Sequence, residues 1–397
     1  MKKTLALLLT AFATMSPAQE KEEDKPARYP PPPYKAFISH IVGKKWKPPL
    51  PEGEKLLDFD IEEVLETLKG RKVVYVETEY MKVISTIPPL KVTPYTRPRI
   101  RESMKMLSGT YPRFKGKYPV ITREQVPHLF AFHMHRMMVA AWKIFRSDLS
   151  TYARYLRDYK HGPYMRQKNK FEIYLFGKRA DYLKFSDRFT GRKYSDGVRH
   201  RAPVSDVLTI LLPPSPSGVK SIDGWVSIII HNWAHNVLMS EIKNSYVIPT
   251  WLDIGFAHWM ERRENDLNTY CFDETGDPPR FASGDWLPKI RTMVLMGKAP
   301  DFADFFLVKT LAEMDGDRHA ICYAILDYLI RERPEGFKPF CYIRREKPGT
   351  LREHFQEAWG ESPEMFYERL LEWIKENYSK KGRIALKEPP RVLQEKE

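Results

Sequence analysis

Residues 224–263 read GWVSIIIHNWAHNVLMSEIKNSYVIPTWLDIGFAHWMERR and decide how this chain folds. The first half fits a buried helix on which His231 and His235 are four residues apart. Because residues four apart project from the same face of a helix, both imidazoles point in one direction. Two nitrogen ligands at about 2.0–2.1 Å make half of a tetrahedral zinc site. The plain alternative is that both are core histidines with no metal.

A second helix is predicted over residues 251–263, after a loop that ends at Pro249. The layout resembles the gluzincin zinc metallopeptidases, in which an H-E-x-x-H motif lies on one helix. Their third ligand, a Glu, comes from a W-L-x-E-G-x-A segment on the next helix. Here eighteen residues, 236–253, separate His235 from position 254, which is the spacing of that family. Besides the two histidines, the resemblance covers Trp251, Leu252, Gly255, Phe256 and Ala257.

Two substitutions remove the chemistry that the resemblance implies. Asn232 stands at the position of the general base, and an amide takes no proton from a metal-bound water. Ile254 stands at the position of the third ligand and has no lone pair for a cation. We therefore interpret the chain as a gluzincin-like pseudopeptidase of the secreted bacterial kind, and expect a binding protein rather than an enzyme. No catalytic residue is assigned.

Two other functions stay open at this stage. An active zinc metallopeptidase with an atypical site requires a metal displaced by one helical turn towards His258, held by His231, His235 and His258. A structural protein of the cell envelope requires only a vestigial cleft. We expect no cofactor, with zinc as the one candidate, because two neutral histidines alone bind it weakly. No G-x-S-x-G motif, glycine-rich phosphate loop or Cys-x-x-Cys pair indicates another chemistry.

The N-terminus has the pattern of a secretory signal. Lys2 and Lys3 precede an apolar stretch, and residues 16–18 form a small-residue cleavage site. We expect residues 1–18 to be a signal peptide and residues 19–55 a proline-rich, extended linker. No later segment approaches 18 uninterrupted apolar residues, so a soluble secreted or periplasmic protein is predicted.

The formal net charge is +14, and much of it is concentrated in one segment. Residues 154–201 hold 14 Lys and Arg against 5 Asp and Glu. Such a field favours an anionic polymer or an acidic protein of the cell envelope, unless it is only a solvated basic face. No nucleic-acid motif accompanies the charge. The residues assigned to binding are Arg154, Arg157, Lys168, Lys170, Lys178, Arg179, Arg192 and Lys193.

The expected fold is α+β and metallopeptidase-like. A mixed N-terminal subdomain (56–223) combines strands 72–86 (a strand or hairpin), 171–176 and 207–212 with helices 61–68, 123–145 and 179–189. The resemblance implies that strand 207–212 flanks the cleft. The C-terminal subdomain (224–378) adds helices 286–296, 302–314, 319–331, 350–359 and 363–378, and residues 379–397 are expected to be a disordered tail. His128, His133 and His135 are interpreted mainly as packing residues of helix 123–145.

Overall fold

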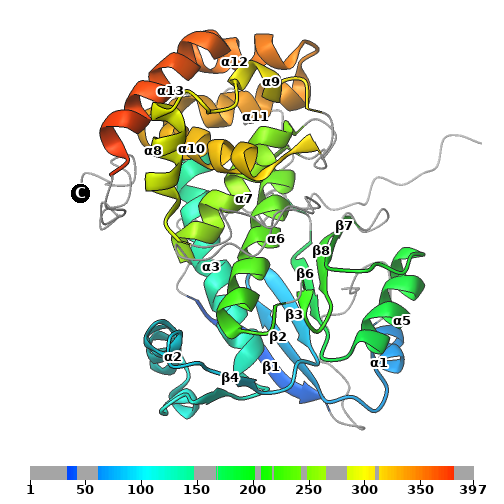
Figure 1. Ribbon diagram of the computed structural model, residues 1–397. Coiled ribbons are helices and arrows are strands. Elements are labelled where there is room, and N and C mark those ends of the chain that lie inside the picture. The colour runs from blue at the N-terminus through cyan, green and yellow to red at the C-terminus, as the bar shows by residue number, and fades with distance from the viewer. Residues whose placement is uncertain are drawn as a thin grey trace, which may run out of the picture.

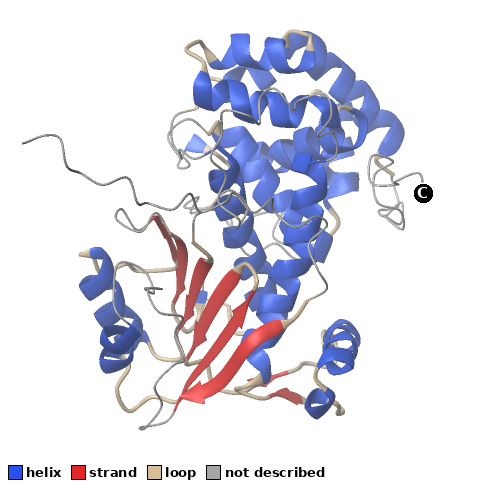
Figure 2. Cartoon of the chain, turned by 180° about the vertical axis from the view of Figure 1, so that it is seen from behind, coloured by secondary structure: helices blue, strands red, loops and turns tan. Residues whose placement is uncertain are grey.

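The computed structural model describes residues 34–42, 61–146, 167, 169–201, 207–216, 219–242, 248–264, 284–308 and 313–379. As the sequence predicts, the fold is α+β: a mixed sheet lies in the N-terminal half and helices dominate the C-terminal half (Figures 1 and 2). The predicted signal peptide, most of the predicted tail, and Arg154, Arg157 and Lys168 lie outside the described residues.

The sheet has six strands among the described residues. In spatial order they are β1 (Ala36–Val42), β2 (Val73–Thr78), β3 (Met81–Ser85), β6 (Phe171–Leu175), β8 (Leu208–Leu212) and β7 (Val198–Arg201). β1, β2 and β3 are antiparallel neighbours, β3, β6 and β8 run parallel, and β7 is an antiparallel edge strand on β8. A short ribbon of β4 (Leu90–Lys91) and β5 (Val120–Ile121) lies apart from this sheet.

Helices cover both faces of the sheet, which is why its strands are apolar on both sides. Alternate residues such as Val74 and Val76 join the core formed with α3 (Gln125–Arg146) and α6 (Ile222–Ile242). Tyr75 and its alternates join a second core formed with α1 (Ile61–Thr67) and α5 (Arg179–Thr190). The parallel connections run through α3 and α5, on opposite faces of the sheet (Figure 1).

The N-terminal half differs from the prediction in several elements. The segment expected to be an unpacked linker contains the strand β1. Its AFISHIV sequence pairs with β2, and Tyr34, which precedes the strand, is buried. α2 (Arg97–Thr110) and β7 were missed. Strand 207–212 does form, as β8, and it lies between β6 and the edge strand β7.

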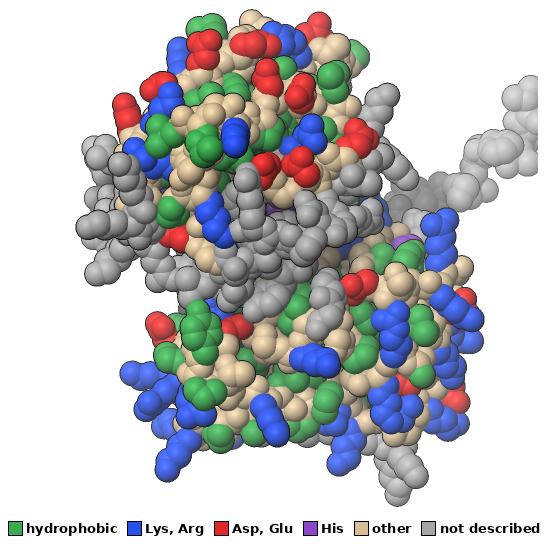
Figure 3. All heavy atoms as spheres, viewed as in Figure 1, with side chains coloured by type: hydrophobic (Ala, Val, Ile, Leu, Met, Phe, Trp, Pro, Cys, Tyr) green, Lys and Arg blue, Asp and Glu red, His purple; other side chains and the backbone are tan. Residues whose placement is uncertain are grey.

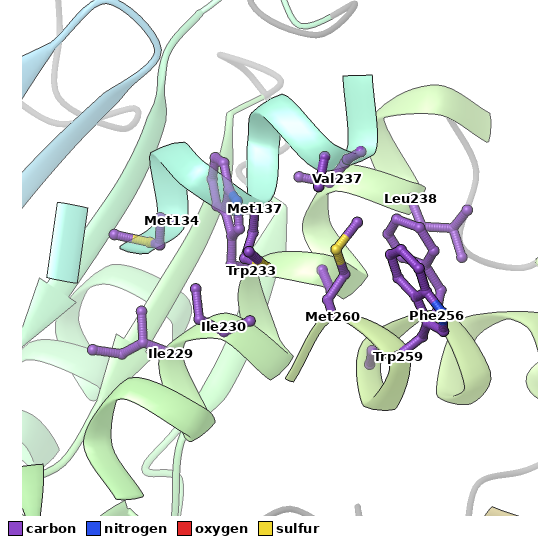
Figure 4. Packing of buried hydrophobic residues seen from close by; sticks show 14 of the residues in the cluster. Met134, Met137, Ile229, Ile230, Trp233, Val237, Leu238, Phe256, Trp259 and Met260 are labelled. Carbon is purple, nitrogen blue, oxygen red and sulfur yellow. The ribbon is translucent and has the colours of Figure 1, made fainter. Parts of the chain in front are cut away.

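The helix pair predicted from residues 224–263 is the centre of the molecule. α6 packs against α7 (Thr250–Glu264) and α3, while α7 also packs against α10 (Gly316–Glu332). Large apolar side chains of α3, α6 and α7 pack against one another there, among them Met137, Trp233 and Met260 respectively (Figure 4). All three are buried, so this junction joins the sheet half to the helical half.

The remaining helices follow the predicted order with two differences. They are α8 (Trp286–Leu295), α9 (Phe302–Phe305), α11 (Phe337–Glu346), α12 (Leu351–Trp359) and α13 (Pro363–Asn377), with 3-10 turns η1 (Pro112–Phe114) and η5 (Pro334–Gly336). α9 is much shorter than the predicted helix 302–314, and α11 was missed. Ser362 caps α13 by accepting from the Met365 amide, and Pro363 occupies the first helical position.

The histidines of α3 serve packing. His128 is hydrogen-bonded to the Tyr34 hydroxyl (3.1 Å) and lies against the rings of Tyr111 and Phe114. His135 packs edge-on against the Tyr34 ring, and His133 Nδ1 lies 2.8 Å from a Glu264 carboxylate oxygen. Burial, with a smaller contribution from Arg113, lowers the pKa of His128 to about 4.

The low pKa of His128 makes stability pH-dependent in a defined window. The folded protein keeps this imidazole neutral, whereas the unfolded chain takes up a proton below its ordinary pKa of 6.5. Its contribution is therefore lost as the pH falls from 6.5 towards 4, by about 2 kcal/mol between pH 7 and pH 5. Urea unfolding at the two pH values measures this loss. The His128→Gln variant should not show the part of this stability loss that His128 causes. An equal loss in both proteins would show that another group is responsible.

Gly255 sets the distance between α7 and α10. A Cβ there would lie 2.5 Å from the Cys322 carbonyl oxygen and 2.5 Å from Leu326 Cδ2. Because a backbone carbonyl cannot move aside, we expect Gly255→Ala to reduce the free energy of unfolding by about 2–3 kcal/mol. The matched control is Gly109→Ala in α2, where nothing lies within 4 Å of the added methyl group. That change should stabilise by about 0.5–1 kcal/mol, and chemical unfolding of both variants tests the contrast.

Candidate functional site

His231 and His235 lie on α6, and position 254 lies on the adjacent α7, as the gluzincin-like spacing predicts. Both imidazoles are buried, and their Nε2 atoms face each other at 3.2 Å. A carboxylate stands behind each ring: Asp253 Oδ1 is 2.6 Å from His235 Nδ1, and Glu261 Oε2 is 3.2 Å from His231 Nδ1. Carboxylates placed in this way fix the orientation of imidazole ligands.

The zinc ion implied by the resemblance does not fit these residues as a catalytic centre. Two Nε2 atoms 3.2 Å apart are close to the separation of about 3.3 Å between two ligands of one tetrahedral ion. Position 254, however, is a fully buried isoleucine, which supplies no third ligand. The pair therefore lacks the three protein ligands and the open position that hydrolysis requires.

Asn232 is held in structural contacts at the place of the general base. Its Nδ2 donates to the Ile228 carbonyl oxygen one turn earlier on α6 (2.9 Å). Its Oδ1 accepts from Arg199 Nη1 on the edge strand β7 (3.3 Å). An amide used at both ends in this way ties α6 to β7 and has no basic atom to offer a water molecule.

A second group of ligand-type atoms lies on the opposite side of His231. His231, His258 and Glu261 are buried, and one ligand atom from each lies within 4.8 Å of the others, so this cluster could hold a metal ion. Glu261 Oε2 is 3.2 Å from both Nδ1 atoms. His258 Nε2 in turn lies 2.7 Å from His319 Nδ1 on α10. The structure thus groups His258 with His231, as the displaced-metal alternative requires, but through Glu261.

Glu261 is ionised despite its burial. Removal from water opposes the charge of this carboxylate, but the hydrogen bonds and the charges of His231 and His258 outweigh it and lower the pKa of Glu261. An anion is therefore fixed between two imidazoles at the centre of the α6–α7 junction. A negative oxygen flanked by two nitrogens suits a divalent transition metal.

The sequence identified only part of this constellation. Asp253 was not assigned to the site, yet its carboxylate contacts His235 from the end of α7 nearest the loop. Glu261 was not assigned to the site either, although its spacing of seven residues from Ile254 already placed it on the facing side of α7. His319 lies 61 residues beyond His258 and gave no local signal.

The predicted basic segment is described only in part. Lys178, Arg179, Arg192 and Lys193 are exposed, as a binding surface requires. Lys170 is instead largely buried and forms an ion pair with Glu77 at 2.6 Å, so it belongs to the sheet. Its predicted role in binding stays a prediction beside this structural contact.

Comparison with known proteins gives no independent assignment. No protein-family model matches the chain, and no curated protein matches it. Among the described helices, none combines the length and apolar character that a membrane crossing requires. The gluzincin-like interpretation therefore rests on the motif spacing and on the helix pair itself.

We expect the wild-type protein to show no chelator-sensitive hydrolysis of casein. Ile254→Glu supplies a ligand without a base, and Asn232→Glu supplies a base without a complete metal site. Hydrolysis above background is expected only from the double variant, and its rate will be limited because Arg199 pairs with the new carboxylate. Zinc-loaded samples of all four proteins in one assay provide the test. Hydrolysis by the wild type that stops with chelator contradicts the pseudopeptidase interpretation.

Proposed function

We propose that this chain is an exported, non-catalytic binding protein on a gluzincin-like scaffold, and that it binds an anionic polymer of the cell envelope. The observation that carries the proposal is the exposed basic face of α5 and its flanking turns. We call this set the α5 basic face; its members are Lys178, Arg179, Lys184, Arg188, Arg192 and Lys193. In Figure 3, Lys and Arg side chains gather on the side of the N-terminal half where α5 lies.

Few carboxylates neutralise the α5 basic face. Arg188 pairs with Glu63, and the Lys193 ammonium lies 3.5 Å from the Asp187 carboxylate. The side chains of Arg188 and Lys193 are each more than half exposed. Among the described residues, Lys178, Lys184 and Arg192 have no carboxylate within ion-pair distance. Exposed pairs are worth little in water, so the face keeps most of its positive potential.

Two cations of the α5 basic face also lie at the end of α5 where the helix dipole disfavours positive charge. Lys178 and Arg179 occupy the N-cap and first positions of α5, next to the positive end of the helix dipole. Cations there cost roughly 0.3–1 kcal/mol each, so they do not serve the stability of α5. An anionic ligand at this end of the helix would relieve the repulsion and bond to the same cations.

The α5 basic face also lies away from the buried histidines. α5 covers the face of the sheet opposite to α6 (Figure 1). The presence of Asn232 and Ile254 in place of the peptidase groups therefore leaves this surface intact. Binding by an inherited scaffold requires no chemistry at α6, which agrees with the structural use of the Asn232 amide.

The binding test compares two variants of equal net charge. The triple substitution Lys178→Gln, Lys184→Gln and Arg192→Gln should lower the affinity for heparin roughly tenfold at about 50 mM salt and flatten its salt dependence. The matched control replaces Lys115, Lys117 and Lys298 by Gln, three exposed lysines outside α5. It should change affinity by less than about twofold, since net charge alone acts only weakly through a screened field. Equal losses in both would show that only the overall charge matters.

A further inference from the structure

Six buried or half-buried side chains of α6, α7 and α10 form a continuous series of contacts at hydrogen-bond distance. In order they are Asp253, His235, His231, Glu261, His258 and His319. Neither the pseudopeptidase interpretation nor the basic face accounts for it. Such a series is costly to bury unless every bond in it has its proton, so the protons can be counted.

Neutral histidines alone do not supply enough protons for all of these hydrogen bonds. Three bonds join Asp253, His235, His231 and Glu261, whereas two neutral imidazoles provide only two N–H groups. One of the rings must then be an imidazolium, or Asp253 must be protonated. On the other side, His258 and His319 supply the two protons that their two bonds require. The His231 side of Glu261 therefore needs either one more proton or a metal cation in its place.

We propose that this cation is one zinc ion, bound by His231 Nδ1, His258 Nδ1 and Glu261 Oε2. The ion replaces both protons that point at Glu261, and the remaining bonds then close with neutral rings. His231 Nε2–H donates to His235, whose Nδ1–H donates to Asp253, and His258 Nε2–H donates to His319. Both outer nitrogens of the ligand histidines thereby gain acceptors, which is the usual arrangement around a metal.

The distances agree with such a site. Glu261 Oε2 lies 3.2 Å from each Nδ1, close to the roughly 3.3 Å between two ligands of a tetrahedral zinc ion. The three ligand atoms lie within 4.8 Å of one another, so the third side closes by no more than about 1.5 Å on binding. Charge agrees as well, because a divalent ion balances the two carboxylates, Glu261 and Asp253, with every histidine neutral.

Burial indicates a structural ion rather than a catalytic one. His231, His258 and Glu261 are each 0% exposed. The Trp286 ring packs on His258 with centroids 5.1 Å apart, and the Arg262 guanidinium lies over the same indole. Burial of all three ligand residues gives a reacting molecule no access to the ion. Its effect is to join α6 to α7, with α10 held through His319.

The same burial decides between metals. Two histidines and one carboxylate are also the ligand set of non-haem Fe(II) enzymes, but these keep open positions for oxygen and a co-substrate. A closed nitrogen and oxygen site favours zinc, which binds more tightly than Fe(II) in the general order of affinities. The site is also distinct from the one implied by the gluzincin resemblance, since it uses the Nδ1 side of His231 and leaves His235 outside.

Metal content and thermal stability of the wild-type protein provide the first test. The full chain is stripped with chelator, dialysed, and equilibrated with zinc alone. We expect about one tightly bound zinc per chain and a rise in Tm of about 3–8 °C at saturating zinc. Failure to retain zinc, or retention with no change in Tm, overturns the proposal, as does stoichiometric iron bound in preference to zinc from an equimolar mixture.

Two histidine variants decide which face of His231 binds the ion. In the proposed site His258→Gln removes a ligand and abolishes tight binding, whereas His235→Gln removes only a supporting bond and weakens binding by about 10–100-fold. The reverse order identifies the Nε2 pair of His231 and His235 as the site and contradicts the proposal. The absorption of bound Co²⁺, recorded for the wild type and for each folded variant, should change more with His258→Gln.

A matched carboxylate pair separates metal binding from general destabilisation. Glu261→Gln and Glu264→Gln both neutralise a buried carboxylate of α7 that contacts a histidine Nδ1. Both should lower Tm without zinc, but only Glu261→Gln should lose the zinc-dependent rise. An equal rise in both variants contradicts the assignment of Glu261. Heparin affinity belongs to the α5 basic face, so its outcome and that of the zinc experiments are independent.

Discussion

The complete burial of α6 is the constraint on which the rest of the structure depends. Its only partly exposed side chain in the described helix is Met239, so neighbours surround it on every side. A helix in this position is stable only if its polar atoms find partners inside the protein. α7 meets that demand for His231 and His235 by presenting Glu261 and Asp253. The two helices are thus joined by polar bonds as well as by apolar packing.

The residues that resemble the gluzincin segment also pack this junction. Tight packing of α7 on α10 requires a glycine at position 255, and Trp251 and Phe256 fill the surrounding core. None of these residues takes part in hydrolysis. Asn232 fits the helix through its bond to Ile228 and reaches β7 through Arg199. The residues that carry the gluzincin resemblance therefore have packing roles in this structure, whether or not the site is catalytic.

Charge is distributed differently in the two parts of the molecule. At the centre, buried carboxylates are matched by histidines or arginines, as with Glu264, which contacts His133 at 2.8 Å and Arg136 at 3.5 Å. Unpaired charge inside would cost several kcal/mol, so matching is required there. On α5, exposed cations outnumber their partners because water tolerates the excess. A surface for anions and a closed polar core can therefore change independently in this fold.

The sequence by itself determined the α+β class, most of the helices and the α6–α7 pair, because these follow from local periodicity and from the spacing of His231, His235 and position 254. It also places an amide, Asn232, where the gluzincin resemblance would put a general base. Tertiary structure alone decided that residues 36–42 form a strand, because an edge strand is stabilised by its partner β2 more than by its own pattern. Only the fold placed His319 beside His258 and the Glu261 carboxylate between two imidazoles. Those contacts join residues far apart along the chain, and local spacing does not predict which distant helix packs against a given helix face.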